Sequence, residues 1–122
     1  MNGTFGGIFA VPLSGGPVTK IVENGDTLPA IGEVTNVWFS FSVDAGGVVF
    51  VAFNEKATPT QRGIFLYSGG AISKIFASGD SLNGGTLTQN GSLEVWPQSY
   101  QNGKIVFEWG GGVYVAAQAD AP

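Results

Sequence analysis

Residues 7–28 read GIFAVPLSGGPVTKIVENGDTL, and residues 63–82 read GIFLYSGGAISKIFASGDSL. The two stretches share, in the same order, Gly-Ile-Phe, Ser-Gly-Gly, Lys-Ile and Gly-Asp followed by a hydroxyl residue and Leu. The offset between the copies drifts only from 56 to 54 residues. A period of this length is typical of stacked or radially arranged units, each unable to bury its apolar surface without a neighbour.

The repeat sets the expected domain organisation. A third copy begins at Gly112-Val113-Tyr114 and stops within a few residues. We expect one domain over residues 1–122, with blade repeats at about 7–53 and 63–109 and a truncated third-copy strand at 112–117.

Composition excludes several classes of protein. Hydrophobic residues make up 43% of the chain and charged residues 11%, which excludes a disordered chain. The net charge of −4 and five dispersed basic residues argue against nucleic acid and against an anionic membrane surface as partners. The sequence contains neither the basic and apolar regions of a signal peptide nor an apolar stretch of membrane-spanning length. We therefore expect no membrane insertion, and these features leave the localisation open.

Short apolar segments separated by Gly-Gly and Asn-Gly turns predict strands throughout, and no segment has helical periodicity. The spacing gives four strands per repeat. The predicted strands lie near residues 6–13, 17–24, 36–43, 47–53, 63–68, 72–77, 92–98, 103–109 and 112–117.

Two kinds of strand suggest the architecture. Residues 48–53 and 105–107 are continuously apolar, which is typical of strands covered on both faces. Residues 37–43 alternate in part between Ser and larger apolar side chains. A four-stranded sheet covered on both faces is the condition of a blade in a β-propeller. We expect an all-β fold of propeller-type four-stranded blades, two per chain.

Two such blades packed together leave their outer faces in water, so we expect the chain to associate with itself. Propellers typically have four to eight blades, so a two-blade chain closes as a trimer of six, which we favour, or as a tetramer of eight. The N-terminal strand and the strand at 112–117 are of the same type. One blade is therefore expected to be completed by strands from another chain or from the opposite end of the same chain.

The repeat resembles a bacterial secreted tandem-repeat family whose units read Asn-x-x-Gly-x-x-Ala-Phe-x-Ala, then Gly-Ile-Phe, a Gly-Gly turn and Gly-Asp. Several positions depart from that pattern. The matching residues are Gly46, Phe50, Ala52, Gly103 and Phe107, and the departures are Val43, Val49, Tyr100, Val106 and Trp109. The resemblance implies a β-propeller-like fold, an extracellular location and no particular chemistry.

The inventory of reactive groups is small. The chain has no Cys and no His, which removes Ser-His triads and zinc sites that use these ligands. A carboxylate pair for glycoside hydrolysis remains formally possible. Asp26 and Asp80 are the only acids at equivalent repeat positions, and the favoured interpretation is that they hold turns through side-chain-to-backbone hydrogen bonds. We expect no catalysis, no metal and no cofactor.

Aromatic residues beside amides suggest a saccharide as an alternative ligand. Trp109 adjoins the glycines at 110–112, Tyr100 lies in a loop with Gln98, Gln101 and Asn102, and Trp38 has the opposite strand parity to Phe39. Core packing is the favoured interpretation for Phe39 and Trp96, which align across the repeats. The candidate ligand-binding residues are Trp109, Tyr100, Trp38, Asp26 and Asp80.

Two functions follow from these observations. The first is a structural or adhesive module whose main property is ordered homo-oligomerisation. The second is a lectin in which repeated weak sugar sites gain avidity by joint presentation.

Overall fold

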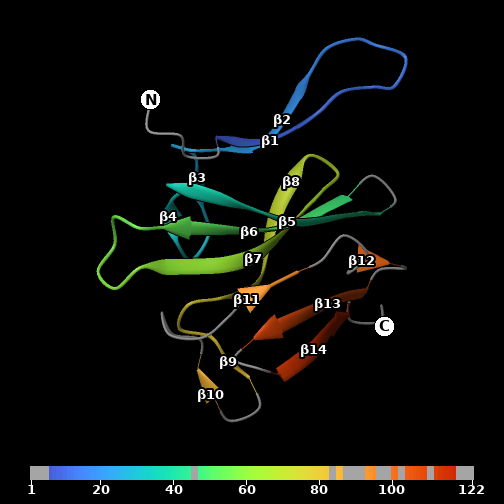
Figure 1. Cartoon of the computed structure of the whole chain (residues 1–122). Coiled ribbons are helices and arrows are strands. Elements are labelled where there is room, and N and C mark those ends of the chain that lie inside the picture. The colour runs from blue at the N-terminus through green and yellow to red at the C-terminus, as the bar shows by residue number, and fades with distance from the viewer. Residues whose placement is uncertain are drawn as a thin grey trace.

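The computed structural model describes residues 6–44, 47–82, 85–86, 93–95, 100–101, 104–109 and 112–117. Within these ranges the side chains of residues 38–44, 82, 85, 86 and 117 are not described. The described chain is all-β and contains no helix, hence none long and apolar enough to cross a membrane (Figure 1). The expectation of an all-β chain is confirmed.

The strands run as follows. They are β1 (Gly7–Ala10), β2 (Thr19–Glu23), β3 (Thr27–Leu28), β4 (Gly32–Glu33), β5 (Asn36–Asp44), β6 (Gly47–Asn54), β7 (Gln61–Ser68), β8 (Ala71–Ala77), β9 (Ser81–Leu82), β10 (Gly85–Thr86), β11 (Leu93–Glu94), β12 (Tyr100–Gln101), β13 (Lys104–Trp109) and β14 (Gly112–Ala117).

The centre of the molecule is an antiparallel four-stranded sheet with the order β5-β6-β7-β8. Its first two strands come from the first sequence repeat and its last two from the second. The sheet therefore straddles the boundary between the two sequence repeats.

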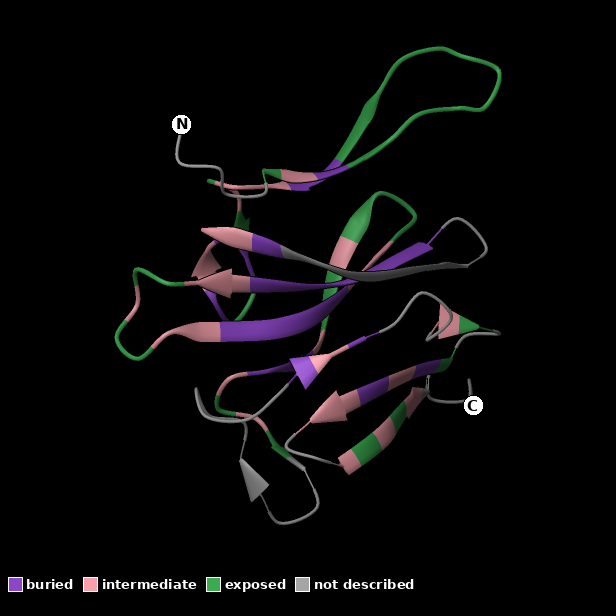
Figure 2. Cartoon of the chain, in the orientation of Figure 1, coloured by how far each residue is buried: buried purple, intermediate pink, exposed green. Residues whose placement is uncertain are grey.

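The central sheet is buried on both faces, as the continuous apolar run in β6 predicts. Val48, Phe50 and Ala52 belong to one core cluster, whereas Val49 and Val51 belong to another. Side chains alternate between the faces of a strand, so the two clusters lie on opposite sides of β6. Figure 2 shows the continuous buried stretch through β6 and β7.

Other layers cover each face of this sheet (Figure 1). Ile8 and Val22 of the β1-β2 hairpin pack on the first cluster, together with apolar residues of the segment containing β3 and β4. Leu93 and Phe107, from β11 and β13, pack on the second cluster. The order of layers is thus hairpin, central sheet, second sheet.

The second sheet is built on β13. β14 pairs with β13 along its whole length, from Lys104 opposite Ala117 to Trp109 opposite Gly112. β11 and β12 therefore share the other edge of β13, each through one short ladder. In the central sheet a single strand, β5, fills the corresponding place.

Structural equivalence follows the sequence repeat in the two Gly-Ile-Phe hairpins. In β1-β2, Phe9 lies opposite Lys20 and the register shifts between Ile8 and Phe9. In β7-β8, Phe65 lies opposite Lys74 and the register shifts between the Ile and Phe of the second copy. The same pairing and the same irregularity occur in both hairpins.

Several details differ from the sequence-based expectation. β1 is limited to Gly7–Ala10, because the segment that follows it contains Pro12 and the Gly15-Gly16 pair, and β2 begins only at Thr19. The two-stranded ladders β3-β4 and β9-β10 follow the Gly-Asp turns and were not expected. Part of the strand expected near 92–98 lies outside the described residues.

Candidate functional site

The two Gly-Asp turns have the same geometry. The Asp26 amide donates to the Glu23 carbonyl at 3.1 Å, and the Glu23 amide donates back to Asp26 Oδ2 at 3.0 Å. In the second copy, the Asp80 amide donates to the Ala77 carbonyl at 2.9 Å, and the Ala77 amide donates to Asp80 Oδ2 at 2.9 Å. Both aspartates close a β-turn by side-chain-to-backbone bonding, as the favoured interpretation predicts.

Glycine is required in these turns. Gly25 has a φ of 99° and Gly79 a φ of 93°, in the left-handed region that other residues rarely adopt. Each turn places the following aspartate beside a lysine six residues earlier in the chain. Lys20 Nζ lies 2.9 Å from Asp26 Oδ1, and Lys74 Nζ lies 3.0 Å from Asp80 Oδ2.

The ion pair in the first turn shifts both ionisations. Partial burial acts to raise the pKa of Asp26, but hydrogen bonds from Lys20 and from the Glu23 amide outweigh it and leave the pKa below its ordinary value. The hydrogen bond to Asp26 holds the pKa of Lys20 above its ordinary value. Asp26 is therefore an ionised acceptor already engaged by its neighbours.

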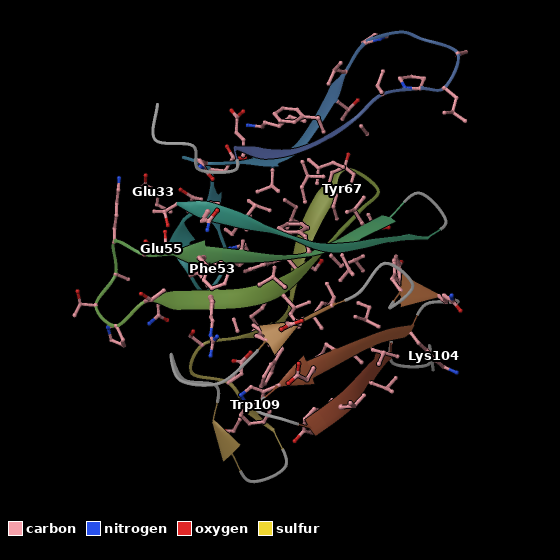
Figure 3. All side chains as sticks on the ribbon, in the orientation of Figure 1. Glu33, Phe53, Glu55, Tyr67, Lys104 and Trp109 are labelled. Atoms are coloured by element: carbon pink, nitrogen blue, oxygen red, sulfur yellow. The ribbon has the colours of Figure 1, made fainter. Side chains whose placement is uncertain are left out.

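A shallow open hollow of about 490 Å³ lies beside the first turn. Lys56 Nζ contacts Glu33 Oε2 at 2.9 Å across it, and Thr35 Oγ1 donates to Glu55 at 3.3 Å. Figure 3 shows Glu33 and Glu55 on the same side of the molecule. The lining residues are Asn24, Gly25, Glu33, Val34, Thr35, Glu55 and Lys56.

One acceptor among the residues that line the hollow is unpaired. Asn24 Oδ1 is buried and has no hydrogen-bond partner among the described atoms. Sequence reasoning missed this site, because its members come from distant segments; Lys56 and Glu33 are 23 residues apart. No local motif joins them, and the Asn-Gly pair at residues 24–25 predicts only a turn.

Trp109 is a packing residue at the margin of the second cluster. Its ring lies 5.2 Å from that of Phe76, edge to face, and 5.7 Å from that of Tyr114. Aromatic pairs at these separations contribute to stability beyond the area they bury. The indole is therefore engaged by neighbouring rings at the end of β13 (Figure 3).

Tyr100 also packs against the second cluster, at the other end of β13 from Trp109. Its ring is close to Gly47, where an added Cβ would lie 3.0 Å from it. Of the remaining loop, Gln101 is exposed, while Gln98 and Asn102 lie outside the described residues, as does Trp96.

The five sequence-predicted residues do not form one site. Asp26 and Asp80 belong to separate turns. Trp109 lies at one end of β13, and Tyr100, in β12, pairs near the other end of that strand. Trp38 lies in β5 within the irregular interval between Val37 and Phe41, and its side chain is not among those described.

Exposed residues occur in the hairpin layer and in β14 (Figure 2), and several of them are large and apolar. Phe9 is 51% exposed in the hairpin layer, and Val113 and Val115 are 67% and 61% exposed in the second sheet. Val11, Leu13 and Val18 add to the exposed apolar surface of the N-terminal hairpin. These exposed apolar side chains make the two regions candidates for interaction surfaces.

Comparisons with models of known families, with curated proteins and with solved structures find no match to this chain. Among the described residues, no group of His, Cys, Asp or Glu side chains is arranged to hold a metal ion. The candidate site with the most direct structural support is thus the pair of exposed outer layers.

Proposed function

We propose that this protein is a non-catalytic, self-assembling β-propeller module with a structural or adhesive role, and that its ordered state is a trimer with six blades. The observation that carries the proposal is the central sheet, whose two faces are both covered by other layers of the same chain. The layers on either side of it carry equivalent strands, and among the described residues Phe9, Val113 and Val115 are exposed on their outer faces.

Repeat equivalence identifies what the outer layers lack. Phe65 of β7 faces the first cluster and is fully buried, whereas Phe9, its equivalent in β1, is half exposed. Ile64 of β7 faces the second cluster and is fully buried, whereas Val113, its equivalent in β14, is exposed. The hairpin layer thus exposes the kind of face that the second sheet buries against the central sheet. The second sheet in turn exposes the kind of face that the hairpin buries.

Complementary faces at the two ends support a head-to-tail arrangement between copies. A heterologous contact of this kind forms a ring when the rotation between copies closes. Three copies of two blades give a ring within the usual range of four to eight blades, and four copies give the upper limit. Two copies would give the lower limit of four blades, and three are favoured because six blades lie in the middle of the range.

The proposal is tested by light scattering on the protein over a range of concentrations, with two variants. Phe9→Asp places a charge in the face that assembly buries, and we expect it to reduce the mass to that of a single chain. Thr19→Asp is the matched control, because Thr19 is exposed in the same hairpin and its equivalent Ser73 is exposed in β8. Equal masses for the two variants would contradict the proposal.

A saccharide-binding function is the second candidate, and the hollow beside Asn24 is the observation that favours it. A sugar hydroxyl would supply the donor that Asn24 Oδ1 lacks, and Glu55 and Thr35 offer further polar atoms. A glycan array tests this candidate. Binding that is lost in Asn24→Ala and kept in Trp109→Ala would support a lectin centred on the hollow, and an array without binding would remove it.

A further inference from the structure

β14 occupies the place in the second sheet that β7 occupies in the central sheet. Tyr114 lies opposite Phe107 as Phe65 lies opposite Phe50. The ring centroids of both pairs are 5.8 Å apart, with interplanar angles of 24° and 26°. The edge of β13 that pairs with β14 is therefore structurally equivalent to the edge of β6 that pairs with β7.

β1 is also equivalent to β7, but it lacks the second neighbouring strand that β7 has. The β1-β2 hairpin reproduces the register and the shift of β7-β8. β7 also pairs with β6 on its other side, but no described strand pairs with the other edge of β1. An unpaired edge of this kind is available to another chain.

The second sheet is incomplete in the complementary way. β14 pairs with β13, but no described strand stands where β8 stands beside β7. The hairpin thus lacks the first two strands of a blade, and the second sheet lacks the fourth. One hairpin added to β13 in place of β14 would give the complete order found in β5-β6-β7-β8.

We infer that the edge of β13 covered by β14 is the binding site for β1 of a second copy of this chain, and that β14 competes for it. This inference rests on the proposed function and adds the contact by which the copies join. The incoming hairpin brings β2 as the fourth strand. It also keeps Ile8 and Val22 on its own central sheet, because these side chains lie on the face of the hairpin opposite to Phe9.

The register of the contact follows from the equivalences. Phe9 of the second copy lies opposite Phe107, where Tyr114 now lies, and Ala10 lies opposite Val106. Phe9 then enters a core of the kind that buries Phe65. Exchange therefore accounts for the exposed ring and the unpaired edge of the hairpin together.

The direct test uses disulfide formation between copies, and the chain contains no cysteine of its own. Ala10→Cys and Val106→Cys are made in separate chains, which are mixed and oxidised. Directly opposed residues in an antiparallel pair have Cα atoms about 4.5–5.5 Å apart, within the range of a disulfide. We expect the mixture to give a covalent heterodimer.

Lys104→Cys is the matched control for the register. Lys104 lies two residues from Val106 on the same face of β13, so it is diagonal to Ala10 in the inferred contact and about 7–8 Å away. We expect at least a several-fold lower yield from the Ala10→Cys and Lys104→Cys mixture. Equal yields would overturn the inferred register.

Light scattering on the unmodified protein separates the two proposals. The protein could assemble while the Ala10→Cys and Val106→Cys mixture gives no higher disulfide yield than the Lys104→Cys control mixture. In that case the exchange inference fails and the proposed function stands. If the protein remains a single chain at every concentration, the proposed function fails and the inference fails with it.

A second variant tests the competition itself. Tyr114→Ala removes the ring through which β14 packs on Phe107 and Trp109. We expect it to increase the assembled fraction several-fold at a fixed concentration, since it weakens the internal competitor alone. A decrease would show that β14 belongs to the interface between copies and would overturn the inference.

Discussion

Phe9 and Phe65 occupy the same position in two hairpins of the same register, yet Phe9 is 51% exposed and Phe65 is completely buried. The difference is one of surroundings, because Phe65 stacks on Phe50 of the neighbouring strand β6, whereas no described strand pairs with the corresponding edge of β1. A phenylalanine is thus buried where its strand has neighbours on both edges, and exposed where no described strand pairs with one edge.

Replacing each phenylalanine with alanine separates a contribution to the stability of the single chain from a contribution to assembly. We expect Phe65→Ala to lower the free energy of unfolding by about 3–5 kcal/mol, as for other buried rings. Phe9→Ala is expected to change the stability of the single chain by about 0.5 kcal/mol or less and to weaken assembly instead. Denaturant unfolding of dilute protein measures the first effect and light scattering measures the second. Similar losses of stability in both variants would contradict the assignment.

The Gly-Asp turns are expected to respond equally to substitution. Asp26→Asn and Asp80→Asn each weaken a bond to a backbone amide and remove an ion pair with lysine. We expect each to lower the free energy of unfolding by about 1 kcal/mol. Chemical denaturation of both variants checks this result. A large loss in one and none in the other would argue against equivalent roles.

The pH dependence follows from the lowered pKa of Asp26. A carboxyl group whose pKa is lower in the folded state stabilises the protein above the pKa of the unfolded chain, and this contribution is lost as the pH falls through the folded pKa. We expect stability to decrease below about pH 4. Thermal unfolding across pH 2–6 measures the decrease, which should be smaller in Asp26→Asn. An unchanged profile in that variant would exclude Asp26 as a source.

The glycine of each Gly-Ile-Phe motif is expected to be required for packing. A Cβ on Gly63 would lie 2.9 Å from Ala77 Cβ, and a Cβ on Gly7 would meet the Val22 carbonyl oxygen. Gly63→Ala and Gly7→Ala are each expected to cost about 1–3 kcal/mol through overpacking. Gly70→Ser is not a suitable control, because its φ of 84° is also restrictive. Ser73→Ala, at an exposed position of β8, is a suitable control. Calorimetry of the three variants compares their free energies of unfolding.

The sequence predicted those parts of the fold that depend on local pattern. The apolar run in β6 predicted burial on both faces, and the repeated Gly-Asp predicted two equivalent turns. The short ladders β3-β4 and β9-β10 were missed, because two-residue strands carry too little periodicity to be recognised.

The hollow beside Asn24 was not predictable, because it depends on the approach of β4 to the segment after β6. The ring contacts of Trp109 were not predictable either. Its sequence position next to three glycines gave no sign of Phe76 and Tyr114, which pack against it from other strands.

The account depends on the outer layers being open ends of a repeating stack, and the mass of the assembled protein tests this most directly. Native mass spectrometry should give a species of three times the 12.6 kDa chain, with its population rising with concentration. A single species of 12.6 kDa that persists at high concentration would contradict the account, since a stable single chain leaves Phe9 and the edge of β1 without a partner.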